Sequence, residues 1–233
     1  MSTDSRDAIL ARIREALREA APLPGHHGEV PKEDPALHAP EEYGQWLPGV
    51  GDDFASQSAL FAKNSADLRT GFHLVETEAE LTARLVQVAR ESGWKRVATH
   101  GGALTDCAVP ALGLPTLNTD GGYATADLEP CDAGITQCDA LVAQTGSVLI
   151  TALSAGGRAL SVLPPHHVVL ARASQMVANL PAAYAVLRDR YPDGFPSFIS
   201  FITGPSRTGD IERILVLGAH GPKQLTVICT TDS

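Results

Sequence analysis

The segment 72–99 constrains the fold more than any other part of the sequence. Two short apolar runs, 72–75 and 96–99, flank a stretch whose apolar residues recur at helical spacing (Leu81, Leu85 and Val88). Thr77 and Glu80 form a capping box at its start, and Gly93 suits its end. A strand, a helix and a second strand in this order predict parallel strands joined by a right-handed crossover.

The segments around this unit extend the same pattern. We expect a helix at about 53–68 ended by Gly71, loop at 119–131, and a helix at 174–190 that Pro181 kinks, splits or restarts. Further strands are expected at 114–118, 168–170 and 225–229. The sequence therefore predicts an α/β fold built on a parallel sheet.

The first 50 residues differ from the remainder in composition. Residues 5–20 show the spacing of an amphipathic helix, and residues 21–50 are rich in Pro, Gly and His. We expect residues 1–50 to form an N-terminal helical arm and residues 51–233 to form the α/β domain. The arm either packs on its own domain or on a neighbouring subunit, or is a loosely ordered tail.

Charge and cysteine content exclude several classes of protein. The formal net charge of −9, without a dense basic run, argues against a nucleic-acid-binding or anionic-membrane surface. No stretch has the length of a membrane span, and no signal-peptide core follows the N-terminus, so a cytoplasmic location is expected. The four cysteines contain no Cys-x-x-Cys pair, which predicts reduced, mostly buried thiols and no metal site.

The stretch 198–222 carries the strongest functional signal. An apolar strand at 198–202 leads into the polar loop 204–210, a helical turn expected near Asp210, and a second apolar strand at 214–217. The loop supplies glycine, hydroxyl and guanidinium groups that suit a carboxylate or phosphate (Gly204, Ser206, Arg207, Thr208 and Asp210). The alternative is a structural loop, in which Asp210 or Thr208 caps the helix and Arg207 pairs with an acid.

A second informative stretch spans residues 139–167. Two apolar runs flank residues 144–147, which form either a tight hairpin turn or a kink that presents hydroxyl groups. We expect short β elements to bring Thr145 and Arg158 near His166 and His167. Thr145, Gly146, Ser147 and Arg158 are the candidate ligand-binding residues of this stretch. No acidic residue is near the histidine pair in sequence, so a metal site is not expected, and one buried histidine beside a solvent-facing one is predicted.

Glycine-rich phosphate motifs are missing from the sequence. Gly101 and Gly102 follow the strand at 96–99, a position where ligands bind in open α/β sheets. The spacing is not Gly-x-Gly-x-x-Gly, and no Walker sequence occurs. Dinucleotide and nucleoside-triphosphate binding therefore have no motif support.

Four ordered motifs resemble those of the lactate utilisation protein C family, which contains the LUD domain. They lie at residues 143–148, 157–167, 204–212 and 220–222, and the resemblance covers about residues 50–230. The resemblance implies a fold similar to that of ribose-phosphate isomerase and the coenzyme A transferases, which is an α/β fold with a Rossmann-like, mostly parallel sheet and additional β structure. It also implies a component of a three-part system that oxidises L-lactate to pyruvate. The two partner proteins carry iron–sulfur clusters, and this chain, which has no cluster spacing of its own, resembles the cluster-free member.

Chemistry suggests roles for residues within these motifs. Arg207 would bind the substrate carboxylate, Thr145 and Ser206 would donate hydrogen bonds, and His167 or His220 would serve as the base. Two other readings remain open. The chain is a non-catalytic scaffold that grips its partners through the arm, or a free-standing isomerase or transferase that binds a phosphate or coenzyme A ester, with Glu212 as a candidate nucleophile.

Overall fold

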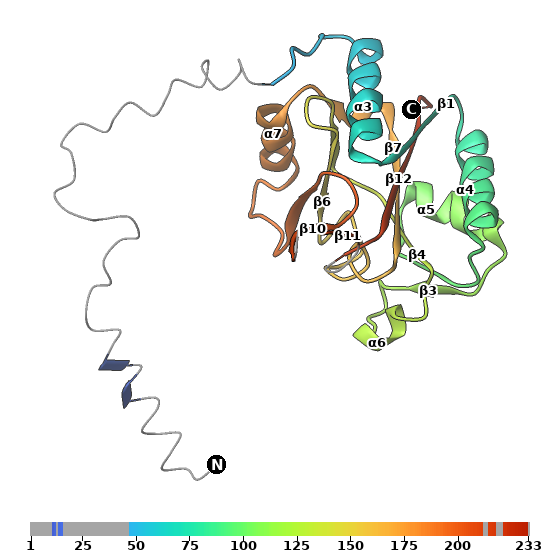
Figure 1. Cartoon of the computed structure of the whole chain (residues 1–233), viewed down its shortest axis with the longest axis vertical. Coiled ribbons are helices and arrows are strands. Elements are labelled where there is room, and N and C mark those ends of the chain that lie inside the picture. Colours follow the sequence, from blue (N-terminus) through green and yellow to red (C-terminus); the bar gives the residue numbers. More distant parts are fainter. Residues whose placement is uncertain (1–10, 13, 16–46, 212–213, 218–220, 233) are drawn as a thin grey trace. The chain divides into compact units, whose positions relative to one another are not determined.

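The computed structural model describes residues 11–12, 14–15, 47–211, 214–217 and 221–232, with backbone only at 208–211 and 214–217. The chain divides into two units, Met1–Gln45 and Trp46–Ser233. In the first unit the four described residues are helical, and they fall within the helix expected at 5–20. The remaining arm prediction lies outside the described residues. The fold described below belongs to the second unit (Figure 1).

A six-stranded parallel sheet forms the centre of the second unit. Its strand order is β1-β12-β7-β4-β2-β3. The bounds are Gly71–Val75 (β1), Val97–Thr99 (β2), Thr116–Asn118 (β3), Ala133–Thr136 (β4), His166–Arg172 (β7) and Gln224–Thr230 (β12). The predicted parallel α/β sheet is confirmed. β1 and β2 are parallel as expected, but β12, β7 and β4 lie between them.

A second, four-stranded sheet supplies the additional β structure. Its order is β8-β5-β6-β9, with bounds Met176–Val177 (β8), Ala140–Val142 (β5), Ser147–Thr151 (β6) and Ile199–Ile202 (β9). β5 and β6 pair antiparallel, and Gly146 takes a φ of 65° in the turn between them. The hairpin alternative for this stretch is therefore correct, because glycine adopts this conformation without steric cost.

The elements stack in four layers (Figure 1). Helices α4 (Glu78–Ser92) and α5 (Ala103–Ala108) pack on one face of the parallel sheet through a buried apolar cluster. The opposite face packs on the second sheet and on α3 (Phe54–Leu68). Helix α7 (Leu180–Arg190) covers the outer face of the second sheet. Both sheets are thus enclosed, which explains their nearly continuous apolar strands.

Capping residues determine where the main helices begin and end. Thr77 accepts a hydrogen bond from the Glu80 amide (3.2 Å), and Gly93 ends α4 with a φ of 67°, as predicted. Asp53 caps α3 in the same way through Ser56. The end predicted for α3 at Gly71 is wrong: Arg69 takes the left-handed conformation with a φ of 61°, and Gly71 already belongs to β1. A non-glycine residue at positive φ is uncommon and locally strained.

Three other boundaries differ from the sequence prediction. The expected loop at 119–131 contains a short helix, α6 (Thr125–Leu128). The helix expected from Ser174 starts only at Leu180, where Asn179 accepts the Ala182 amide and Pro181 occupies the first turn. The intervening residues form a 3₁₀ turn, η3 (Ala173–Gln175), and β8. Pro181 therefore starts a new helix, because a proline ring suits the first helical turn. A further 3₁₀ turn, η2 (Val109–Leu112), follows α5.

The helical turn predicted near Asp210 is wrong. Residues Arg207–Ile211 form β10, which pairs antiparallel with β11 (Ile214–Leu217) in a separate ribbon. The register shifts between Thr208 and Ile211, so the ribbon is irregular. β-Branched residues in both segments favour pairing with each other over an isolated helical turn.

Close packing at the centre of the parallel sheet predicts that Gly134→Ala destabilises the fold. A Cβ atom at Gly134 would lie 2.3 Å from the Leu160 carbonyl oxygen, which belongs to the backbone and cannot move aside cheaply. We expect a loss of roughly 1 to 3 kcal/mol in the free energy of unfolding, measured by urea denaturation. Gly121→Ala, where nothing lies within 4 Å, is the matched control. Equal stability of the two variants would contradict this packing.

Candidate functional site

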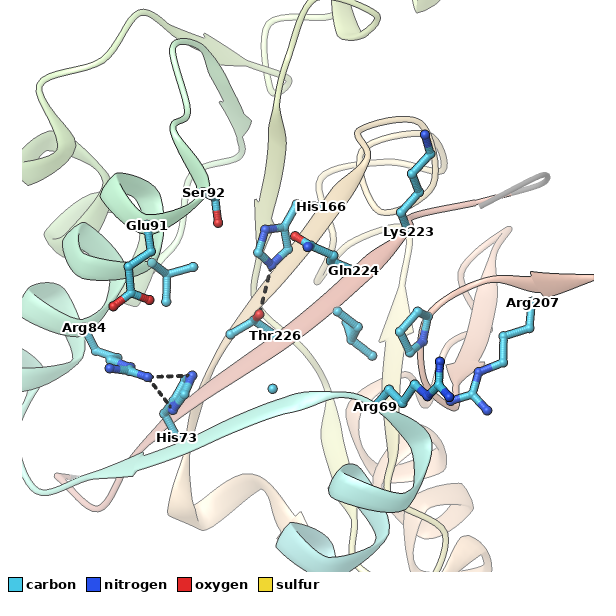
Figure 2. A pocket seen from close by; sticks show the side chains of 14 residues that line it. Arg69, His73, Arg84, Glu91, Ser92, His166, Arg207, Lys223, Gln224 and Thr226 are labelled. Atoms are coloured by element: carbon cyan, nitrogen blue, oxygen red, sulfur yellow. Dashed lines mark hydrogen bonds between the residues drawn. The ribbon is translucent and has the colours of Figure 1, made fainter. Parts of the chain in front are cut away.

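A cationic pocket opens at the amino ends of β1, β12 and β7 (Figure 2). Its volume is about 490 Å³. The strands, the C-terminal half of α4, the residue that ends α3 and the segment 205–207 all contribute to its lining. The segment 205–207 follows β9 of the second sheet and reaches this pocket at the amino edge of the parallel sheet.

Strand alternation selects which side chains face this pocket. Neighbouring residues of a strand point to opposite faces, so His73 of β1, His166 of β7 and Thr226 of β12 all lie on the face covered by α4. Arg84 and Glu91 are two turns apart on α4, and both reach the same space. The pocket is therefore assembled from segments that are far apart in sequence.

Positive charge dominates the lining. Four side chains are permanently cationic at neutral pH (Arg69, Arg84, Arg207 and Lys223), whereas Glu91 is the acidic residue among those that line the described pocket. Figure 2 shows the Arg69 and Arg207 guanidinium groups side by side at one end, and Arg84 with His73 at the other. Like charges this close repel each other unless an anion lies between them, so the pocket is suited to a carboxylate or phosphate.

Arg207 also has a structural contact. One of its guanidinium nitrogens donates to the Leu68 carbonyl oxygen in the last turn of α3. A cation at a helix C-terminus is favourable because the last carbonyl groups have no partner within the helix. The sequence analysis expected that a structural Arg207 would pair with an acidic side chain. Its partner is instead the Leu68 carbonyl oxygen. The other guanidinium donors face the pocket beside Arg69 (Figure 2).

His166 is the buried polar side chain of the pocket. Its Nε2 lies 2.9 Å from the Thr226 hydroxyl, and its ring packs edge-on against Trp94 at 5.1 Å between centroids. Nδ1 is buried and has no hydrogen-bond partner among the described residues. Burial lowers the pKa of His166 from 6.5 to about 4, so the imidazole is neutral at neutral pH.

His73 and Arg84 form the other end of the pocket. An Arg84 Nη nitrogen lies 3.1 Å from His73 Nδ1 and 3.2 Å from Nε2. Partial burial, and then the Arg84 charge, lower the pKa of His73, while Glu91 opposes the shift. His73 is therefore also expected to be neutral at neutral pH, which leaves the arginines and lysine as the source of charge.

The predicted partition of the histidine pair is wrong. Both residues are buried, His166 at 6% exposure and His167 at 1%, because β7 begins two residues earlier than expected and includes them. His167 points to the opposite face from His166 and lies 2.9 Å from the Thr136 hydroxyl. Burial and the neighbouring His166 lower its pKa to about 3. His166 therefore reaches the cationic pocket, and His167 does not line it.

The remaining predicted ligand-binding residues are dispersed. Thr145, Ser147 and Thr203 form a chain of hydroxyl hydrogen bonds of 2.8 Å each, and the Gly146 turn and Gly204 pack against the last turns of α3. No hydrogen bond within the described part of the chain joins Thr145 or Arg158 to either histidine, and Arg158 is exposed. These contacts hold the hairpin, the 203–207 segment and α3 together.

Four predicted residues cannot be placed. His220 lies outside the described residues, as does Glu212, and the Thr208 and Asp210 side chains are not described. Ser206 lines a separate cavity of about 230 Å³ and donates its amide to the Pro222 carbonyl (2.9 Å). Of the predicted site residues, Arg207 is thus the one that the structure places in the cationic pocket.

Sequence reasoning missed most of the pocket lining (Arg69, His73, Arg84, His166, Lys223, Gln224 and Thr226). One signal was available: alternation along a parallel strand assigns His166 and His167 to opposite faces. The rest depended on strand order, which brings β1 beside β12. Cys107 is exposed, and the other cysteines are buried, as predicted for most of them. Among the described residues there is no group of three or more His, Cys, Asp or Glu side chains placed to hold a metal ion.

Comparison with known proteins assigns the chain to a family. A model of the LUD domain matches residues 59–230, which is well over half of the chain. The chain belongs to the LUD domain family. The resemblance found in the sequence motifs is therefore confirmed, and the match covers the parallel sheet, the second sheet and the cationic pocket.

Curated relatives of this LUD-domain chain share one name. Lactate utilization protein C of Geobacillus sp. is 38% identical over 45% of this chain and 44% of the relative. The protein of that name from Shouchella clausii is 35% identical over 49% and 51%, and that from Bacillus licheniformis is 29% identical over 70% of each chain. The first two matches thus span about half the length of each relative.

A solved structure supports the fold of the LUD-domain chain. A DUF162 family protein from Deinococcus radiodurans superposes with a TM-score of 0.60 over 77% of this chain and 99% of the other, at 22% sequence identity. At this identity the likeness establishes the architecture alone. In the part of the chain that is described, no helix combines the length and apolarity needed to span a bilayer.

The low pKa of His166 predicts a pH-dependent stability. Between pH 6.5 and pH 4 the unfolded chain protonates this histidine while the folded chain does not, so folding weakens as pH falls through this window. His166→Gln should remove about 2 to 3 kcal/mol of the stability difference between pH 7 and pH 4.5. Urea denaturation of both proteins at each pH measures this. An identical pH dependence in the variant would show that His166 titrates normally.

Proposed function

We propose that this chain is a cluster-free component of an iron–sulfur-dependent system that oxidises L-lactate to pyruvate, and that it binds a small carboxylate in the cationic pocket. The observation that carries the proposal is the convergence of Arg69 and Arg207 at one end of that pocket. The curated relatives, named Lactate utilization protein C, support the choice of substrate.

The pocket residues suit a 2-hydroxy acid. The two guanidinium groups offer planar forks that match the oxygens of a carboxylate. The hydroxyl group of the substrate would lie at the floor of the pocket beside His166 and the Thr226 hydroxyl, which are 2.9 Å apart. With a pKa of about 4, His166 is a weak base, and its role is to orient the hydroxyl group.

Oxidation of lactate to pyruvate releases two electrons and two protons. We assign the electron acceptors to iron–sulfur clusters in two partner proteins and no cofactor to this chain. The chain would bind and orient the acid, and the complex would perform the oxidation in the cytoplasm. The base that takes the hydroxyl proton of lactate would be His220 or a residue of a partner protein. His167 is buried and hydrogen-bonded to Thr136, so it cannot reach the substrate.

A phosphate or coenzyme A ester is the second candidate ligand. Four cations against one acid would suit a multiply charged anion, and about 490 Å³ exceeds the space that lactate needs. This would make the chain a free-standing transferase or isomerase. A non-catalytic scaffold is the third alternative, and it predicts that loss of the pocket charge leaves lactate oxidation unchanged.

Binding of L-lactate should depend on the two arginines. Titration calorimetry with sodium L-lactate is expected to show at least roughly tenfold weaker binding for Arg69→Ala and for Arg207→Ala, because each removes a charge-assisted hydrogen bond. Arg188→Ala, an exposed arginine on α7 away from the pocket, is the matched control. Arg69→Ala keeps the contact from Arg207 to Leu68, so it separates binding from stability. Unchanged affinity for L-lactate in both pocket variants would show that L-lactate does not bind in this pocket.

Activity should require the chain together with its partners. We expect dye-linked L-lactate oxidation by the mixture with the two iron–sulfur proteins, little by this chain alone, and at least tenfold less when Arg207→Ala replaces it. Turnover by the chain alone would show that it carries its own electron acceptor. Oxidation that does not depend on the chain would favour the scaffold or transferase alternatives, which inorganic phosphate and coenzyme A titrations then separate.

A further inference from the structure

A second cavity lies at the opposite edge of the parallel sheet, beyond the carboxyl ends of β2 and β4. From β2 the chain continues to β3 on one side, whereas β4 pairs with β2 on the other, so the strand order reverses at this point. Such a switch point leaves a crevice where ligands of open α/β sheets bind. Here the crevice is a cavity of about 340 Å³.

Both sheets contribute to this switch-point cavity. His100, Gly101 and Gln137 come from the loops after β2 and β4, and Leu153, Ser154 and Arg190 come from the side of the second sheet and α7. The two strand loops are in close contact: a Cβ atom at Gly102 would lie 1.8 Å from the Gln137 amide nitrogen. Only glycine allows this approach, so the end of the cavity is tightly built.

A buried carboxylate holds Arg190 at the cavity. Asp139 has a fully buried side chain, and its Oδ1 accepts hydrogen bonds from Arg190 (2.9 Å) and from the Tyr191 hydroxyl (2.8 Å). Burying a carboxylate costs several kcal/mol, and a well-packed apolar residue at a buried position often gives a more stable protein. Arg190 itself remains half exposed. The pair therefore orients a guanidinium whose other donors are free for a ligand.

The other polar groups of the cavity divide into satisfied and free ones. His100 uses both ring nitrogens: Nδ1 lies 2.8 Å from the Gly101 carbonyl, and Nε2 accepts from the Gln137 backbone amide at 3.2 Å, which leaves the Gln137 side-chain NH₂ group for other partners. Gln175 likewise uses both atoms of its amide, on Cys138 and Arg172. Three groups keep donors without a partner among the described residues: Arg190, the Gln137 amide and the Ser154 hydroxyl.

We propose that the switch-point cavity binds a short 2-oxo carboxylate. Arg190 would hold the carboxylate, the Gln137 and Ser154 donors would reach the oxo oxygen, and Leu153 would contact the carbon chain. The free groups that line the cavity each offer a donor, so a ligand of acceptors satisfies them, whereas a 2-hydroxy acid would place one more donor among them. This inference rests on the cavity alone and holds whether or not the cationic pocket binds lactate.

Amide chemical-shift perturbation tests both where the ligand binds and whether the cavity prefers pyruvate to L-lactate. Titration of the full chain with sodium pyruvate is expected to shift the amide signals of Gly101, Gln137 and Ser154, and L-lactate should require at least tenfold higher concentrations to do so. Signals of Lys223 and Gln224 report the cationic pocket separately. Shifts confined to those two residues, no shifts at all, or equal affinity for the two acids at the switch-point cavity would overturn the proposal.

Two variants test the contacts. Arg190→Lys keeps the charge beside Asp139 but loses the planar fork, and we expect about tenfold weaker pyruvate binding at Gly101. Leu153→Trp changes an exposed side chain (67%) at the cavity and should block binding without disturbing the ion pair. Arg207→Ala should leave this binding unchanged. Wild-type affinity in both Arg190→Lys and Leu153→Trp would refute the site, even where the lactate assays succeed.

Discussion

The pairing of β12 with both β1 and β7 is the interaction on which the rest of the second unit depends. β12 is the last strand of the chain, yet it lies between one of the first strands and a middle one, with parallel ladders on both sides. This pairing brings Thr226 opposite Gly71 and Gln224 opposite His166. The floor of the cationic pocket therefore forms only when β12 has paired with β1 and β7.

Burial and charge act in opposite directions within this pocket. Desolvation lowers the pKa of His166 and His73 and keeps both rings neutral, because a charged imidazole loses its hydration when it is enclosed. The arginines and Lys223 remain charged, since they are partly exposed to water. The result is a cationic rim over a neutral polar floor, an arrangement that can bind an anion without burying an unpaired charge.

The two cavities of the parallel sheet have different electrostatic designs. At the amino edge, several cations share one space with a single acid, so a ligand must supply the counter-charge. At the carboxyl edge, Asp139 already compensates Arg190, and what remains is hydrogen-bond directionality. The first design favours charge, and the second favours shape and the placement of acceptors. This LUD-domain chain therefore has two cavities of different electrostatic character at the two edges of one sheet.

The sequence by itself determined the family and most of the element types. Capping residues, helical spacing and short apolar runs predicted α3, α4 and most strands, because these signals depend on nearby residues. It also singled out Arg207. Only the tertiary structure decided that Arg207 meets Arg69, that His166 rather than His167 faces the pocket, and that residues 207–211 form a strand. These outcomes depend on strand order and pairing between distant segments, which no local pattern encodes.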